Sequence, residues 1–189
     1  LVINEIMYYP TYQYNYNEWI EIYNDEDVAI DLANYTLCDD LLVAGYIDKT
    51  GNINDEQGTV LEPDSYAVIT DGGSGTEVYD NYGVDDGALA FHVEKSSLCG
   101  GGLHDTGETI KISDNETVID EIAYTDDAER GFSLELREGI FSQSTVIDGT
   151  PGRENSEFVD NSTDNSSNDD NTNQSDDADE DSEDENEEE

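Results

Sequence analysis

The alternation of side chains in residues 17–24 is the feature that most constrains the fold. Apolar and polar side chains alternate there around Trp19, the one tryptophan of the chain. Ile20 and Ile22 fall on one face of an extended backbone, whereas Trp19 and Glu21 fall on the other. A period of two with aromatic and β-branched residues is typical of a strand in a packed sheet. We therefore expect a core strand here, with Trp19 as its anchor.

Similar short apolar segments recur along the chain, separated by Gly, Pro, Asn and Asp, and helical periodicity is poor throughout. Strands are predicted at residues 1–8, 18–24, 29–32, 35–38, 59–61, 66–69, 109–113, 117–124 and 132–137, with a less regular arm at 41–47. Residues 76–105 contain one apolar piece, 88–91, and at most one short helical turn is expected there. Roughly eight short strands at this spacing predict an all-β, antiparallel β-sandwich.

The charge of the chain restricts its partners. Its 189 residues include 49 Asp and Glu but 6 Lys and Arg, which gives a formal net charge of -43. Residues 1–159 hold 34 of the acidic residues and all 6 basic ones, so the expected folded part is acidic as well. Such a surface repels nucleic acid and anionic lipid. Three explanations of the charge remain: adaptation to high salt, calcium binding and a basic partner. High salt would screen the self-repulsion of the acidic surface.

Residues 156–189 differ in composition from the rest of the chain. Asn, Ser, Thr, Asp and Glu dominate, and after Val159 the one apolar residue is Ala178. A segment that buries so little apolar surface cannot offset the entropy of ordering its backbone. The sequence therefore predicts a folded domain at residues 1–155 and a disordered acidic tail or linker at 156–189.

The sequence contains no match to a nucleophile elbow or a phosphate-binding loop, and no pair of carboxylates is singled out. We therefore expect no catalytic residues, no cofactor and no enzymatic activity. Calcium is the expected metal if one binds, because hard oxygen ligands abound, although no stretch fits an EF-hand loop. The candidate calcium ligands are Asp25, Asp27, Asp39, Asp40, Asp85, Asp86, Asp126 and Asp127. Solvated acidic loops are the alternative interpretation of all four pairs.

Cysteines and sequons suggest an exported protein. Cys38 and Cys99 are expected either to pair, which would contribute about 4 kcal/mol by closing a loop, or to remain two buried thiols. Candidate N-glycosylation sites are Asn34, Asn115, Asn161, Asn165 and Asn173. The sequence shows no signal peptide, initiator Met or long apolar run. We therefore expect either a mature exported product or a piece of a longer protein, without membrane insertion in this segment.

The order of these motifs resembles the lamin-tail domain family. Segments similar to the family's opening, middle, central hairpin and ending lie at residues 2–6, 18–24, 30–37, 61–69, 103–124, 131–135 and 149–155. The resemblance spans residues 1–155 and implies an immunoglobulin-like β-sandwich. Prokaryotic domains of this kind are similar to modules of secreted or surface proteins, often beside nucleases, proteases or adhesive repeats. Two departures are Ile140 and Phe141, where the family often has a Trp, and the long glycine-rich insert at 71–105.

The sequence thus predicts a non-catalytic structural or adhesion module of a secreted or cell-surface protein, with an acidic surface adapted to salt. The alternatives are a targeting module of a larger secreted enzyme and a calcium-stabilised subunit of an extracellular assembly. The expected partner is a protein or a cell-surface glycan. Self-assembly through the N-terminal strand at residues 1–8 is a further hypothesis, because a terminal strand can complement a neighbour's sheet edge. A functional surface is expected in the Tyr-rich connection at 9–16 or in the glycine-rich insert after residue 71.

Overall fold

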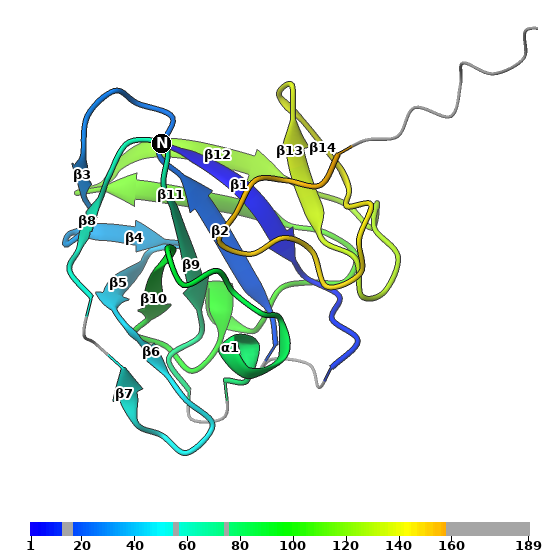
Figure 1. Cartoon of the computed structure of the whole chain (residues 1–189), viewed down its shortest axis with the longest axis horizontal. Coiled ribbons are helices and arrows are strands. Elements are labelled where there is room, and N and C mark those ends of the chain that lie inside the picture. The colour runs from blue at the N-terminus through cyan, green and yellow to red at the C-terminus, as the bar shows by residue number, and fades with distance from the viewer. Residues whose placement is uncertain (13–16, 55–56, 74–75, 158–189) are drawn as a thin grey trace, which may run out of the picture. The chain divides into compact units, whose positions relative to one another are not determined.

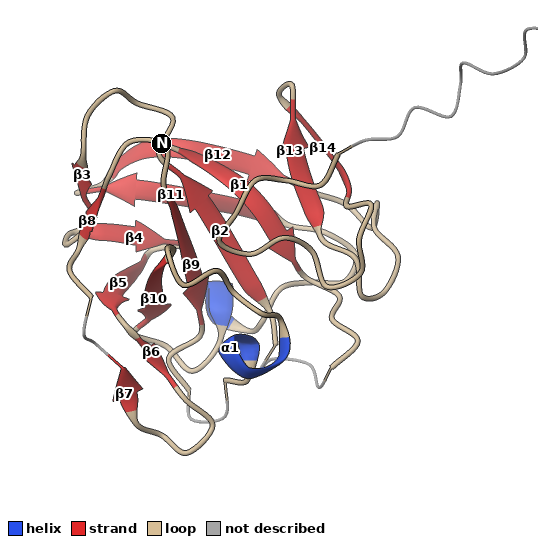
Figure 2. Ribbon diagram, viewed as in Figure 1, coloured by secondary structure: helices blue, strands red, loops and turns tan. Residues whose placement is uncertain are grey.

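Strands make up most of the ordered secondary structure (Figures 1 and 2). The computed structural model describes residues 1–12, 17–54, 57–73 and 76–157, so the predicted tail lies outside the described residues from 158 onward. The strands are β1 (Val2–Met7), β2 (Trp19–Tyr23), β3 (Ile30–Asp31), β4 (Tyr35–Leu37), β5 (Asp40–Ala44), β6 (Tyr46–Ile47), β7 (Ile53–Asn54), β8 (Val60–Leu61), β9 (Tyr66–Thr70), β10 (Leu89–Val93), β11 (Thr109–Asp114), β12 (Thr117–Ala123), β13 (Leu134–Arg137) and β14 (Ile140–Gln143). The helical pieces are α1 (Val78–Asn81) and the 3-10 turn η1 (Leu98–Gly100).

Most of these strands form one curled 10-stranded sheet, in the order β12-β11-β4-β5-β10-β9-β2-β1-β13-β14. Two small sheets, β3-β8 and β6-β7, flank it. The curl brings β12 against β1, where the Ile3 N–H donates a hydrogen bond to the Asp120 carboxylate at 2.8 Å. The curled sheet therefore faces itself as two layers, which confirms the all-β sandwich that the sequence predicts.

One apolar cluster fills the space between the layers. As the alternation predicts, β2 directs Ile20 and Ile22 into it, and both are fully buried. The cluster also contains Ile3 and Ile6 from β1, Leu37 from β4, Phe91 from β10, and Ile110 and Ile112 from β11. Burying a side chain of this size contributes about 1.5–3 kcal/mol, so strands far apart in sequence are held together mainly by this cluster.

The opposite face of β2 is buried as well, under α1 and its neighbouring loops. Trp19 is fully buried there and packs with Met7, Val68 and Val78. Its ring meets the ring of Tyr82 edge-on, with 6.0 Å between the centroids. Trp19 is thus an anchor, but of this second cluster rather than of the core between the layers.

Several details differ from the sequence predictions. The apolar piece at 88–91 belongs to strand β10, which pairs in parallel with β9, whereas the other described strand pairs are antiparallel. The expectation of at most one helical turn in 76–105 is wrong, since both α1 and η1 lie there. Strand β14 was not predicted; it forms a hairpin with β13 through Glu138 and Gly139, which both have positive φ. In the described part of the chain, no helix has the length and apolarity to span a membrane.

Strand β1 occupies an interior position in the sheet. It pairs with β2 along most of its length and with β13 at Glu5 and Ile6. Self-assembly through β1 would therefore require the strand to leave β2 and β13 and to exchange into a second copy of the domain. It stays a prediction.

Candidate functional site

Three glutamates form a row across adjacent strands on the face of the sheet that points away from the main core. Glu5 of β1 lies opposite Glu21 of β2 on one side and Glu135 of β13 on the other. Their strand neighbours, such as Ile20 and Leu134, point the other way into the main core. All three glutamates are 0% exposed. A row of buried carboxylates is costly unless each one is hydrogen-bonded or protonated, so the structure must supply partners.

A C-terminal strap, residues 149–156, supplies those partners. It is drawn in orange in Figure 1, where it crosses β1 and β2. The Thr150 N–H donates to Glu5 at 2.9 Å, the Gly152 N–H to Glu21 at 2.5 Å, and the Ser156 N–H to Glu135 at 3.0 Å. Each carboxylate therefore attaches one backbone amide of the strap.

Side chains complete the shells of the three carboxylates. Ser133 donates to Glu5 at 2.5 Å, the Asn4 amide donates to Glu21 at 2.7 Å, and Arg137 forms an ion pair with Glu135. Asn4 also exchanges amide hydrogen bonds with Asn155 of the strap at 2.9 and 3.1 Å. Strap and sheet are thus joined by a continuous polar network.

The Thr150 hydroxyl reveals the protonation state that fits this network. Its Oγ1 lies 3.0 Å from Glu5 Oε2 and 3.0 Å from Glu135 Oε1. A hydroxyl carries one proton, so it can donate to one of these oxygens but not to both. A proton on Glu5 resolves the conflict, because Glu5 then donates to Thr150 and Thr150 donates to Glu135.

The electrostatics agree with this assignment. Burial raises the pKa of Glu5 to about 7, and the charge of Glu135 adds to the rise against the hydrogen bonds from Ser133 and Thr150. Burial, and after it the charge of Glu5, also raises the pKa of Glu21 well above its ordinary value. Desolvation disfavours the charged form of a carboxyl group, so burial favours the protonated form of Glu5.

Glycine is required at two positions of the strap. Gly149 has φ +71°, and a Cβ there would lie 2.3 Å from Glu5 Oε1 and 2.6 Å from Ser133 Oγ. Gly152 has φ +85°, and a Cβ would lie 2.9 Å from the backbone nitrogen of Asp85. The Gly-Thr-Pro-Gly sequence therefore lets the strap approach the carboxylates closely enough to donate its amides.

Paired carboxylates with a raised pKa are also found in enzymes such as glycosidases, so a catalytic role needs to be weighed. A glycosidase pair must reach a sugar and a water molecule. Glu5, Glu21 and Glu135 are enclosed by the strap, and their hydrogen-bonding oxygens are occupied by protein donors. The geometry is that of a structural attachment.

Comparison with protein families matches the chain to the Lamin Tail Domain over residues 1–126. The match covers well over half of the sequence. The chain belongs to the Lamin Tail Domain family. The search of curated proteins and the search of solved structures return no match. Membership of this family indicates a non-catalytic, immunoglobulin-like module, in agreement with the sandwich fold and the enclosed carboxylates.

The strap of this lamin tail domain lies outside the matched range, although Glu5 and Glu21, which attach it, lie within. The sequence pattern places Glu21 on the strand face opposite Ile20 and Ile22, but it does not single out Glu5 or Glu135. The available signals were the glutamates at apolar-flanked strand positions and the Gly-Thr-Pro-Gly motif. Neither signal shows that the two segments meet, because 131 residues separate Glu21 from Gly152.

The structure places the calcium candidates in four separate segments of the lamin tail domain, with Asp40 as the first residue of β5. Asp25, Asp27, Asp85, Asp86, Asp126 and Asp127 are exposed, and Asp25 forms an ion pair with the amino terminus of Leu1 at 2.5 Å. Asp39 and Asp40 form ion pairs with Lys111 and Lys95 at 2.8 and 2.7 Å. Among the described residues, no three His, Cys, Asp or Glu side chains are grouped so that they could hold a metal ion. Calcium binding stays a prediction.

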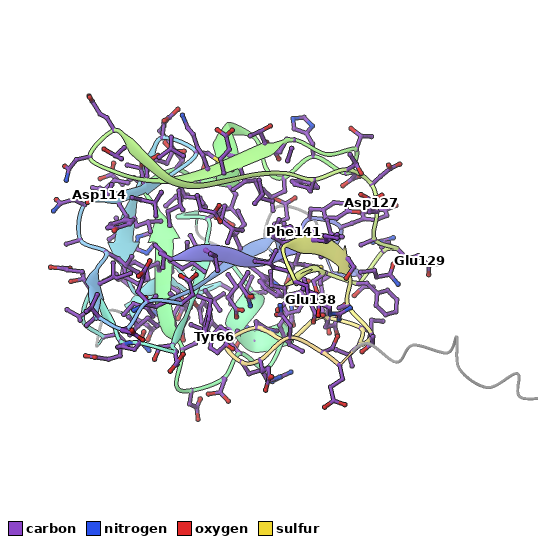
Figure 3. All side chains as sticks on the ribbon, turned by 90° about the horizontal axis from the view of Figure 1, so that it is seen from above. Tyr66, Asp114, Asp127, Glu129, Glu138 and Phe141 are labelled. Carbon is purple, nitrogen blue, oxygen red and sulfur yellow. A yellow bond between two sulfur atoms is a disulfide. The ribbon has the colours of Figure 1, made fainter. Side chains whose placement is uncertain are left out.

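Asp126 and Asp127 contribute to an acidic hollow of about 450 Å³. Asp105, Glu129 and Tyr9 line it with them, and Figure 3 shows Asp127 and Glu129 near one another at one end of the domain. Exposed carboxylates at such a position attract cations or basic side chains.

The two cysteines are separated by 61 positions in the sequence. A disulfide joins Cys38, directly after β4, to Cys99 in η1, with 5.0 Å between the Cα atoms. It ties the glycine-rich insert to β4. Pairing in solution stays a prediction.

The candidate glycosylation sites divide into two groups. Asn34 and Asn115 are exposed on turns, the second between β11 and β12. Asn161, Asn165 and Asn173 lie outside the described residues. Modification of any of them stays a prediction.

The Tyr-rich connection is described in part, because residues 13–16 lie outside the described ranges. Tyr12 packs edge-on against Tyr82, with 5.2 Å between the ring centroids, and its hydroxyl lies 3.4 Å from an Asp148 oxygen. The described end of this connection is thus packed against the domain.

Proposed function

We propose that this lamin tail domain is a non-catalytic structural or adhesion module of a secreted or cell-surface protein, and that its acidic surface is an adaptation to high salt. The observation that carries the proposal is the enclosure of Glu5, Glu21 and Glu135. Groups with a raised pKa are the usual acids and bases of an active site. Here their burial and hydrogen bonds serve to attach the strap.

The surface charge supports the salt adaptation. Residues 1–159 carry a formal charge of -28, and the acidic residues are distributed over many loops rather than concentrated at one ion site. Self-repulsion of that size destabilises a compact domain at low ionic strength and is screened at high salt. The Cys38–Cys99 disulfide supports an exported location, since disulfides persist mainly in oxidising compartments.

Urea unfolding in KCl from about 0.1 M to about 3 M tests the adaptation. We expect the free energy of unfolding to rise continuously with KCl. A variant in which the exposed Asp27, Asp86 and Asp126 are replaced by Asn should gain less from the same salt, because it has less repulsion to screen. Sucrose, which is uncharged, separates screening from general exclusion effects. A flat response to KCl in the unmodified domain would contradict the proposal.

A panel of polysaccharide, ester, peptide and nucleic-acid substrates tests the absence of catalysis. We expect no turnover above that of the heat-denatured domain. Hydrolysis that persists after Glu5→Gln would place chemistry elsewhere on the chain, and hydrolysis that Glu5→Gln abolishes would assign it to the enclosed glutamates. Either result would refute the non-catalytic module. The alternative of a targeting module would be favoured by a catalytic domain encoded next to this segment.

A further inference from the structure

The curled sheet does not close on itself. Its order begins with β12 and ends with β14, and each of these strands has one described neighbour within the sheet, β11 and β13 respectively. Strand β1 also leaves part of one edge open, because its pairing with β13 is limited to Glu5 and Ile6. One side of the sandwich is thus bounded by unpaired strand edges.

A groove of about 580 Å³ lies along this open side, within the range of typical ligand sites. Its apolar lining comes from Val2, Ile122, Leu134, Leu136, Ile140 and Phe141. Figure 3 shows Phe141 in the region between the β13–β14 hairpin and the β11–β12 hairpin. Ile140 is 71% exposed, so the groove presents an apolar surface to solvent.

The Asp120 carboxylate accepts backbone amide protons that a neighbouring strand would otherwise accept. Its Oδ2 accepts the Ile3 N–H of β1 at 2.8 Å, and its Oδ1 accepts the Glu121 N–H of β12 at 2.9 Å. In a closed sheet, the carbonyl oxygens of an intervening strand would accept such amide protons. A single side chain thus substitutes for part of a backbone ladder.

The adjoining part of β12 keeps its backbone groups directed outward. The Tyr124 N–H donates across the hairpin to the Glu108 carbonyl at 3.0 Å. Because directions alternate along an antiparallel strand, the N–H and C=O of Ala123 and the C=O of Glu121 face the open edge, whereas the Glu121 N–H is bonded to Asp120. An exposed edge of this kind is a template for a further strand.

Acidic side chains also line the groove. Asp120, Glu121 and Asp127 line it, and Asp127 also lines the acidic hollow with Asp105 and Glu129. The groove therefore combines apolar and negatively charged lining, and beside Asp127 it adjoins the acidic hollow. None of the described groove-lining residues is Lys or Arg.

We propose that this groove binds an extended segment of a partner protein, which adds to the open edge of β12 as a further strand. Its alternate apolar side chains enter the groove over Ile140 and Phe141, and its Lys or Arg residues lie at the end beside Asp127. This deepens the proposed function, on which it rests, because it gives the non-catalytic module a binding surface and a partner class. Main-chain hydrogen bonds would supply affinity and the side-chain contacts specificity.

Charge distinguishes three possible occupants of the groove: the C-terminal residues of this chain, a second copy of the domain and a basic segment of a partner protein. The C-terminal residues 160–189 of this chain contain 15 acidic and no basic residues, so they would be repelled by Asp120, Glu121 and Asp127. A second copy paired through β12 would place the same carboxylates close together, and like charges at such positions destabilise a sheet. A basic, apolar strand has neither penalty.

Fluorescence anisotropy with a labelled peptide tests the proposal. The peptide has about ten residues, alternates Val and Thr, and carries lysines at one end, with a second version that carries them at the other. We expect saturable binding of one version, loss of binding when glutamates replace the lysines, and loss when alternate amides of the peptide are N-methylated. N-methylation removes backbone donors without touching the fold of the domain.

Domain variants then locate the site. Ala123→Pro removes an outward N–H and Ile140→Ser removes apolar lining, and each should weaken binding about tenfold. Asp127→Asn should weaken it about threefold. The matched controls Ile53→Ser, at a 59% exposed isoleucine of β7, and Asp27→Asn should leave the affinity unchanged. Thermal melts verify that each variant is folded.

Three results would overturn the proposal: equal affinity of the N-methylated peptide, equal effects of the groove and control variants, or concentration-dependent dimerisation that Ala123→Pro abolishes. Absence of any binding would do so as well. None of these results would affect the salt response or the substrate panel, so the groove and the non-catalytic function are tested separately.

Discussion

Replacing Glu5 by Gln should remove much of the pH dependence of folding. Glu5 Oε1 accepts hydrogen bonds from Ser133 and the Thr150 N–H, while Oε2 faces the Thr150 hydroxyl. Glutamine can place its carbonyl oxygen at the first position and its amide nitrogen at the second. The amide then donates to Thr150, and Thr150 donates to Glu135, as in the protonated form of Glu5. Gln is therefore a permanently neutral substitute that preserves the hydrogen bonds.

The size of the effect follows from linkage. Burial raises the pKa of Glu5 from 4.5 to about 7. Below pH 4.5, Glu5 is protonated in both folded and unfolded chains and contributes no pH dependence. Between pH 4.5 and 7 the folded chain binds more protons, so the free energy of unfolding falls as the pH rises. At pH 8 the accumulated loss is about 3 kcal/mol, since one pKa unit corresponds to about 1.4 kcal/mol.

Urea unfolding at pH 5 and at pH 8, in molar KCl to screen surface charge, measures this loss. We expect the wild-type domain to be more stable at pH 5, and Glu5→Gln to be stabilised at pH 8 by up to about 3 kcal/mol and to have a much smaller difference between the two pH values. Glu62→Gln is the matched control, because Glu62 is exposed and loses the same charge. A remaining slope is expected from Glu21, whose pKa is raised as well.

Two outcomes would refute this reasoning. If Glu5→Gln kept the full pH dependence of the wild type, the proton would not reside on Glu5. If Glu5→Gln destabilised the domain at pH 8 while Glu62→Gln did not, Glu5 would be required as an anion and the hydroxyl of Thr150 would donate to it rather than to Glu135.

Three further predictions concern stability. Replacing Cys38 and Cys99 together by Ser should lower the free energy of unfolding by about 4 kcal/mol, measured in urea against the reduced wild type, which should show the same loss. Gly149→Ala should cost at least about 2 kcal/mol more than Gly83→Ala, because both have positive φ but a Cβ at Gly149 meets Glu5 whereas nothing lies within 4 Å at Gly83; equal losses in calorimetry would contradict the close approach. Calcium at fixed ionic strength should leave the melting temperature unchanged, and a rise would revive the calcium-stabilised alternative.

Local patterns were sufficient to predict most strands and the class of fold. The alternation around Ile20 and Ile22 correctly identified the core face of β2, because a strand's side-chain period is set by its own backbone. The hairpin of β11 and β12 was predicted for the same reason, since its strands are joined by a short turn. In contrast, β10 was missed because the short apolar piece at 88–91 lies in a glycine-rich segment and pairs in parallel with β9, a contact that no local turn specifies.

The candidate site could be predicted much less completely. Glu5, Glu21 and Glu135 become a row only when β1 pairs in register with β2 and β13, and the strap reaches them from residues 149–156. The sequence does not distinguish a glutamate that is buried and protonated from one that is solvated. The environments of Glu5 and Glu21 are created in large part by strap residues more than 100 positions away, so their role cannot be inferred from their neighbours in sequence.

By itself, the sequence determined the all-β class, the acidic character and the membership in a family of sandwich domains, because side-chain period, charge and ordered motifs are properties of the chain. The tertiary structure decided which carboxylates are enclosed, that the two cysteines lie close enough to bond and which strand edges stay open. These features depend on register and on the closing of the sheet, which result from packing between distant segments. Trp19 illustrates both: its strand was predictable, but the cluster that it anchors exists only because α1 folds over that face of the sheet.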